Sequence, residues 1–241
     1  MGGGIPGQFA LTFDRLCTRP VGGRRPFANK ELAQIVNKQG GDITEGYISL
    51  LRKGRRDNPT LQTVENLASA LGVCPAVFVG GRVERRGEEN PRSSFPAKLR
   101  RLFSAAHPPG RGPYTPEEVA KAICVEGRYG SISPSYIREL LNPPADTLPN
   151  PRFKHILGLV AHFGLPDDSS GPLGAYFLDD ELAATVDAQL ANYVALRDTG
   201  VIEFAMRMAD QAPRLSPDLR RRAVETFIQA LESGEPPGCF R

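Results

Sequence analysis

Apolar residues along most of this chain recur every three or four positions, which is the spacing of one face of an amphipathic helix. Residues 30–37 and 45–53 show this spacing in short runs, and residues 180–198 show it over a longer one. No stretch alternates apolar and polar residues between hairpin turns, so we expect no β-sheet. The pattern predicts an all-α fold.

The same order of elements occurs twice, in residues 13–73 and in residues 99–165. In each copy a short amphipathic segment is followed by a loop rich in Gly, Pro and Arg, and then by two short helices. Asn58-Pro59 in the first copy matches Asn150-Pro151 in the second, and each copy closes on an apolar helix. A repeat of this length predicts a duplicated domain rather than a solenoid unit.

The composition divides the chain into four parts. Residues 80–94 mix charged residues with Gly and lack apolar periodicity, as is typical of a linker. A second break rich in Asp, Ser, Gly and Pro covers residues 166–172, and residues 1–8 are Gly-rich and expected to be disordered. We therefore expect domains at 9–79, 95–166 and 175–235, with the linker at 80–94.

The first copy has the pattern of a helix-turn-helix. Asn29 is expected to cap a helix over residues 30–37, Gly40-Gly41 supplies a tight turn, and Thr44 is expected to cap a second helix over residues 45–53. Two short helices across a glycine turn, the second with a small and polar front, are the arrangement that reads DNA in this motif.

The residues that follow carry a family resemblance. The run Tyr47 to Pro59, with Val64, Leu67, Ala68 and Leu71-Gly72-Val73 after it, resembles the Cro/C1-type (XRE) helix-turn-helix family. The resemblance implies a lambda-repressor-like DNA-binding domain of five helices whose third helix enters the major groove. On that basis the expected reading front is Thr44, Glu45, Gly46, Ser49 and Leu50. The expected phosphate contacts are Arg52, Lys53, Arg55 and Arg56, with Arg24 and Arg25 from the earlier loop.

The second copy keeps the cap and the apolar positions but not the basic run. Its candidate DNA contacts are Ser133, Ser135, Arg138 and Arg111. Pro143-Pro144 replaces the arginines and is expected to end the helix early. Two interpretations stay open for this copy: direct contact with DNA, or a degenerate copy that binds protein.

A closer resemblance covers about residues 95–233. Residues 107–119, 175–181 and 196–201 are similar to segments of the EspR-like family of mycobacterial nucleoid-associated regulators. Members of that family pair a helix-turn-helix domain with a C-terminal helical dimerisation domain, so the resemblance implies a homodimer. The chain departs from the family pattern at Pro143-Pro144, and it carries an additional domain in front.

The tail is predicted to form three helices that make up this dimerisation module. Asp179 or Asp180 is expected to cap the first, which ends near Gly200, and Ser216 is expected to cap the third. Three short helices make a thin core, which a second copy of the chain would complete. The expected dimer contacts are Leu182, Val186, Leu190, Val194, Phe204, Met208, Phe227 and Leu231.

Charge separates the repeats from the tail. The net charge is +3, with +5 on residues 1–92, +3 on residues 93–167 and −5 on residues 168–241. A polyanion is drawn to the repeats and repelled by the tail. No signal peptide or apolar span of membrane length is present in the sequence, so we expect a cytoplasmic protein of the nucleoid that contacts no membrane.

The sequence holds no motif for catalysis. The four cysteines form no C-x-x-C pair, and His155 and His162 lie seven residues apart, too far for one metal ion. No nucleophile elbow, phosphate-binding loop or H-E-x-x-H motif appears. We therefore expect no enzyme, no metal and no cofactor.

These observations predict a homodimeric regulator of transcription that binds double-stranded DNA with a sequence preference. RNA polymerase or another regulator is a possible further partner. Two alternatives remain open. One is an architectural nucleoid protein that bridges DNA, which Glu45 and Gly46 favour because they read bases poorly. The other is an interaction scaffold in which the second helix-turn-helix docks a protein.

Overall fold

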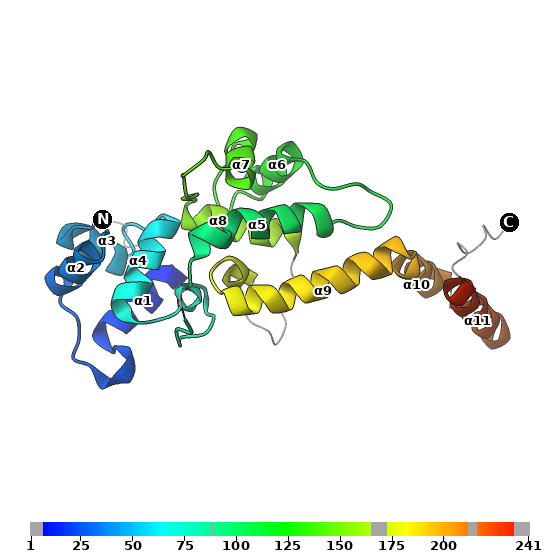
Figure 1. Cartoon of the computed structure of the whole chain (residues 1–241), viewed down its shortest axis with the longest axis horizontal. Coiled ribbons are helices and arrows are strands. Elements are labelled where there is room, and N and C mark those ends of the chain that lie inside the picture. The colour runs from blue at the N-terminus through cyan, green and yellow to red at the C-terminus, as the bar shows by residue number, and fades with distance from the viewer. Residues whose placement is uncertain (1–6, 88, 165–172, 212–215, 234–241) are drawn as a thin grey trace.

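The computed structural model describes residues 7–87, 89–164, 173–211 and 216–233. Over these ranges the chain forms α-helices and short 3-10 helices, with two isolated β-bridges in place of any strand. The all-α prediction is therefore confirmed. Figure 1 shows the helices of the two repeats gathered together and the last three helices extending from them as an arm.

The first repeat consists of α1 (Gln8–Thr18), α2 (Asn29–Lys38), α3 (Glu45–Arg52), α4 (Leu61–Leu71) and the 3-10 helix η2 (Pro75–Val79), with a short 3-10 turn η1 (Val21–Gly23) in its first loop. Phe13, Leu32 and Ile48 are fully buried among them. The helices thus present their apolar faces to one core, as the periodicity predicts.

The second repeat consists of α5 (Pro91–Ala105), α6 (Pro116–Glu126), α7 (Pro134–Leu141), α8 (Phe153–Phe163) and η3 (Leu173–Phe177). Its last element matches that of the first repeat: Phe78 of η2 stacks on Phe9 at 4.8 Å between ring centroids, and Phe177 of η3 stacks on Phe95 at 4.4 Å. The predicted boundary at residue 175 is therefore misplaced, because Tyr176 and its neighbours are buried in the core of the second repeat.

The two repeats pack directly on one another. The Leu61 N–H donates to the Pro151 carbonyl at 2.8 Å, and the Phe153 N–H donates to the Pro59 carbonyl at 2.8 Å. Phe9 of the first repeat lies edge-on to Phe153 of the second at 5.2 Å. The two repeats thus share one continuous core rather than forming separate beads.

The predicted linker at 80–94 is in part wrong, because its end is helical and its middle is held in place. Helix α5 already begins at Pro91. Arg82 donates from Nε and Nη2 to the Asp179 carboxylate at 2.5 and 3.0 Å, and it also pairs with Glu89. Burial raises the pKa of Asp179, but the hydrogen bonds and charge of Arg82, together with the N–H groups of Leu182 and Glu181, lower that pKa below its usual value. One arginine thus fixes the segment to the start of the arm.

Helix α9 (Asp180–Asp198) begins the arm as predicted, since the Asp179 carboxylate accepts from the Glu181 and Leu182 N–H groups. Its apolar stripe, however, does not face outward. Leu190 is buried in the common core, and Leu182, Val186 and Val194 pack against that core. The prediction that this stripe contacts a second copy is therefore corrected, because α5 of the same chain covers it.

The arm ends in α10 (Val201–Gln211) and α11 (Pro217–Ser233). The Ser216 hydroxyl accepts from the Leu219 N–H at 3.4 Å, which agrees with the predicted cap. Phe204 and Phe227, expected at a dimer contact, instead stack on one another within the chain, with ring centroids 4.0 Å apart and planes 2° apart. The predicted break at 166–172 and the side chain of Leu231 lie outside the described residues.

The Arg82 cluster generates a stability prediction. We expect Arg82→Met to lower the free energy of unfolding by about 3 kcal/mol, because it leaves the buried carboxylates of Asp179 and Glu89 without their counter-charge. The matched control is Arg86→Met, whose exposed pair with Glu181 contributes about 0 to 1 kcal/mol. Urea unfolding of both variants measures the difference. Equal losses would show that the Arg82 cluster does not hold the segment.

Candidate nucleic-acid interface

The turn of the first helix-turn-helix is held by one asparagine. Asn37 at the end of α2 accepts from the Ile43 N–H at 2.9 Å and donates from Nδ2 to the Ile43 carbonyl at 3.0 Å. Gly40 has a φ of 84°, which side chains rarely adopt. A Cβ at Gly41 would lie 2.6 Å from Val36 Cγ1. Both glycines are therefore required by the turn that aims α3.

Helix α3 is capped and anchored as predicted. The Thr44 hydroxyl accepts from the Tyr47 N–H at 3.2 Å, and Ile48 and Leu51 are fully buried. Those two anchors leave the opposite face outward, where Thr44, Glu45 and Gly46 are exposed and Ser49 and Leu50 are half-buried. A Cβ at Gly46 would meet no atom within 4 Å, so the glycine keeps the front of the helix shallow without being needed by the fold.

Arg52 has a different role from the one predicted. Its Nε donates to Asp14 Oδ1 at 2.8 Å, and its Nη1 donates to Asn29 Oδ1 at 2.8 Å. Asn29 is therefore not the cap of α2, whose N-cap position is Ala28 with no side-chain hydrogen bond. The guanidinium ties α3 to α1 and α2, and only 20% of the Arg52 side chain is exposed.

The other predicted phosphate contacts of the first repeat lie on the surface. Lys53, Arg55 and Arg56 are exposed in the loop after α3, and no ion pair engages them among the described residues. The N–H groups of Arg55 and Arg56 both donate to the Leu50 carbonyl, at 2.9 and 3.2 Å. This loop therefore follows α3 closely and places three cations beside its outward face.

The two arginines of the early loop lie on the surface as well. Arg24 is exposed, and Arg25 donates to Glu31 Oε1 at 2.9 Å with 77% of its side chain exposed. An ion pair this exposed contributes little to stability and exchanges readily for another anion.

The second helix-turn-helix repeats this geometry. The Ser133 hydroxyl accepts from the Tyr136 N–H at 3.2 Å, and Ile137 and Leu140 are buried. Helix α7 has eight residues, as many as α3, so the prediction that Pro143-Pro144 ends the helix early is wrong. The prolines reshape the following loop instead.

The candidate contacts of the second repeat are partly occupied. Ser135 is exposed, Arg138 pairs with Glu117, and Arg111 donates to Glu118 Oε1 at 2.8 Å while lying over the Tyr114 ring at 4.0 Å. More than a third of each arginine side chain is exposed, at 53% and 37%. Both cations therefore lie where an incoming phosphate could exchange with the carboxylate.

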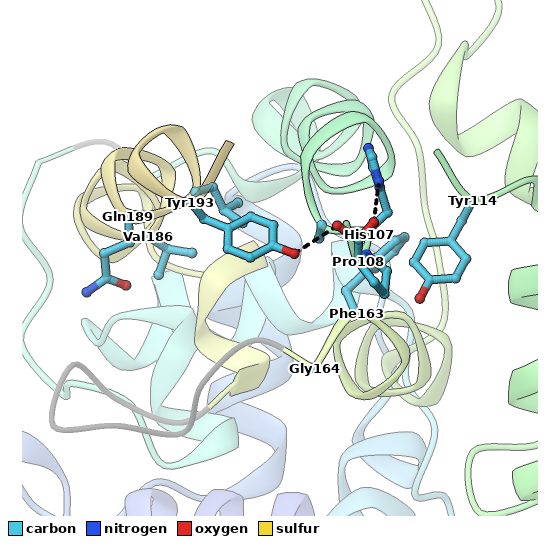
Figure 2. Close-up of a pocket in the computed structure, with 10 residues that line it drawn as sticks. His107, Pro108, Tyr114, Phe163, Gly164, Val186, Gln189 and Tyr193 are labelled. Atoms are coloured by element: carbon cyan, nitrogen blue, oxygen red, sulfur yellow. Dashed lines mark hydrogen bonds between the residues drawn. The ribbon is translucent and has the colours of Figure 1, made fainter. Parts of the chain in front are cut away.

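A cavity of about 370 Å³ lies where α9 meets the second repeat. Figure 2 shows Tyr114 and Phe163 on one side of it and Val186 and Tyr193 on the other. The Tyr193 hydroxyl donates to the His107 carbonyl at 2.9 Å. Arg197 donates from Nη1 to the Ala105 carbonyl at 3.0 Å and to His107 Nε2 at 2.8 Å. These hydrogen bonds set the direction of the arm.

The remaining titratable groups suggest packing rather than chemistry. Burial lowers the pKa of His155 and His162, so both rings stay neutral at pH 7 inside the second repeat. Over the residues that the structure describes, no three His, Cys, Asp or Glu side chains lie close enough to hold a metal ion. None of the described helices combines the length and the apolar character needed to cross a bilayer.

The comparisons with known proteins give the family. No protein-family model matches the chain. The nucleoid-associated protein EspR of Mycobacterium tuberculosis, from strains H37Rv and CDC 1551, is 34% identical over 115 residues, which are 48% of this chain and 78% of EspR. The chain belongs to the EspR family. About half of the chain lies outside this match, so the family relationship does not account for both repeats.

The structural role of Arg52, which the exposed arginines of the following loop do not share, generates a second prediction. We expect Arg52→Ala to lower the free energy of unfolding by about 1 to 2 kcal/mol, because Asp14 and Asn29 lose their shared donor. Arg55→Ala, three residues on in the exposed loop, serves as the control and is expected to change stability by less than about 0.5 kcal/mol. Thermal unfolding followed by circular dichroism compares them, and equal melting temperatures would contradict the supporting role of Arg52.

Proposed function

We propose that this member of the EspR family is a nucleoid-associated regulator that binds double-stranded DNA through its helix-turn-helix repeats. The observation that carries the proposal is the outward face of α3 with three unpaired cations, Lys53, Arg55 and Arg56, in the loop beside it. A capped helix with a shallow front enters a major groove, and cations at its end bind the phosphates along the groove.

The character of the α3 front favours a weak sequence preference. Gly46 offers no side chain to a base edge, and the exposed Glu45 can only accept, from the amino group of a cytosine or an adenine. Ser49 bonds to several bases with little discrimination. Most of the affinity then comes from phosphate contacts, which fits the association with the nucleoid that the name of EspR states for that protein.

The loop cations supply the test of this function. We expect the triple variant Lys53→Ala, Arg55→Ala, Arg56→Ala to bind duplex DNA at least about tenfold more weakly at 100 mM salt. Its plot of log affinity against log salt becomes shallower by about 2 to 3, because each lost phosphate contact removes about 0.9 from the slope. Fluorescence anisotropy with a labelled duplex measures both quantities.

The control removes the same charge elsewhere. Lys121, Arg207 and Arg222 are exposed on α6, α10 and α11, and their joint change to Ala is expected to leave the salt slope within about 0.5 of that of the unchanged chain. If the two triple variants bind alike, the contribution of the loop is only its net charge and α3 is not at the interface.

We further propose that the chain acts as a homodimer through the arm. The residues predicted for this contact on α9 are covered by α5, but the arm exposes other large apolar side chains, namely Leu196, Met206, Leu219, Val224 and Ile228. Exposed apolar residues gathered on helices with little core of their own are typical of a subunit interface. The sequence did not predict these positions, because the apolar residues at helical spacing on each helix were expected to be the dimer contacts.

A charge on this face tests the dimer. We expect Ile228→Glu to convert the chain from a dimer to a monomer, because it places a carboxylate in a desolvated contact. Gln229→Glu introduces the same charge at the next position of α11, which is also exposed but polar, and is expected to stay dimeric. Multi-angle light scattering gives the mass of each. A dimer that survives Ile228→Glu would move the interface away from α11.

A further inference from the structure

The two repeats meet through an exchange of equivalent contacts. Asn58 Oδ1 accepts from the Lys154 N–H at 2.9 Å, and Asn150 Oδ1 accepts from the Gln62 N–H at 3.0 Å. Asn58 matches Asn150 in the repeat, and Gln62 matches Lys154. Each asparagine therefore caps the first turn of the last α-helix in the other repeat.

The backbone between these residues continues the exchange. The Pro59 carbonyl accepts from the Phe153 N–H and the Pro151 carbonyl accepts from the Leu61 N–H, both at 2.8 Å. Thr60 and Arg152 form an antiparallel bridge between them. In each of these asparagine and backbone contacts the two partners can be exchanged for their equivalents 92 positions away. Such a set of contacts defines a pseudo-two-fold axis through Thr60 and Arg152, as in an isologous dimer interface.

A second contact supports the same relation. The 3-10 helices η2 and η3 are the fifth elements of the two repeats, and they also touch each other. A Cβ at Gly174 of η3 would lie 2.9 Å from Val79 Cγ1 of η2, and a Cβ at Gly81 would lie 3.3 Å from the Ala175 Cβ. Like elements therefore meet at two places, and both contacts fix how the repeats pair.

The same axis relates the two reading helices, because α3 and α7 are equivalent elements of the two repeats. The loop that carries Asn58 follows α3, and the loop that carries Asn150 follows α7. Arg152 belongs to the bridge on this axis, its side chain is exposed, and its Nη1 donates to the Asn58 carbonyl at 3.4 Å. One exposed arginine thus lies at the centre of the pair of repeats.

The fronts of the two helices differ. At equivalent positions α3 presents Ser49 where α7 presents Arg138, and Gly46 where α7 presents Ser135. An arginine selects guanine, whereas a serine discriminates little. A two-fold pair with unlike readers recognises two unlike sequences in opposite orientation.

We propose that one chain recognises a composite DNA site made of two unlike half-sites in inverted orientation, with α3 on one, α7 on the other and Arg152 over the centre. This inference rests on the proposed DNA-binding function. It differs from recognition by a homodimer, in which a second chain supplies the second half-site and both halves are the same.

The test selects duplexes from a random pool with the full-length chain and repeats the selection with two variants. We expect two unlike half-sites whose centres lie about one helical turn apart. Arg138→Ala is expected to remove a guanine preference in one half only, and Ser49→Arg, which gives α3 the side chain that α7 carries at the equivalent position, is expected to add a guanine preference in the other half only. Lys121→Ala on α6 serves as the control and is expected to change neither.

Spacing and stoichiometry separate the proposal from a flexible tether and from a dimer. Inserting either about 5 or about 10 base pairs between the half-sites is expected to lower the affinity at least about tenfold, because the rigid junction cannot follow. A flexible tether would tolerate the longer insertion. In native mass spectrometry the Ile228→Glu chain is expected to form a complex of one chain per composite site.

Three outcomes contradict the inference in distinguishable ways. Two identical half-sites, or a preference that only the α3 variant changes, would overturn it while DNA binding stands. Two chains on each composite site with the arm variant would overturn it in the same way. No binding to any duplex at low salt would overturn the proposed function itself, and this inference with it.

Discussion

The first N–H groups of a helix have no acceptor within that helix, and in this chain α4 and α8 each find acceptors for the first two in the other repeat. Asn58 and Asn150 supply side-chain oxygens, and Pro59 and Pro151 supply carbonyl oxygens. A buried donor without an acceptor costs about 1 to 3 kcal/mol, so separating the two repeats would cost free energy. The relative placement of the two reading helices follows from that exchange.

The arm depends on the same assembly through a different set of forces. Arg82, in the segment after the first repeat, donates to Asp179, which caps α9. This one ion pair therefore links that segment to the arm. Lys98 of α5 is buried and pairs with Asp180 at 2.7 Å, although burial lowers its pKa. Charges held this way tolerate few alternative geometries, because a displaced partner would leave an uncompensated charge in a dry site. The direction of α9 is therefore set by ion pairs as well as by its apolar stripe.

Features decided within one turn of chain could be predicted from the sequence. Thr44, Ser133 and Asp179 each cap the helix that follows them, because a short polar side chain accepts from an N–H two or three residues on. The periodicity also located the helices. What the sequence could not reveal are partners far apart along the chain: Arg52 with Asp14, Arg82 with Asp179, and the two Asn-Pro loops with each other. A basic run looks the same whether a nearby carboxylate engages it or not.

The stripe on α9 illustrates the same limit for apolar residues. Leu182, Val186, Leu190 and Val194 mark a face that must be covered, but periodicity does not say by what. In the chain α5 covers it, whereas the arm beyond α9 exposes other large apolar side chains, with Met206 63% and Ile228 48% exposed. The chain therefore has a part that is symmetric within itself, formed by the two repeats, and an arm that exposes apolar side chains. A homodimer through the arm, as we propose, has a two-fold axis of its own, separate from the axis that relates the two repeats.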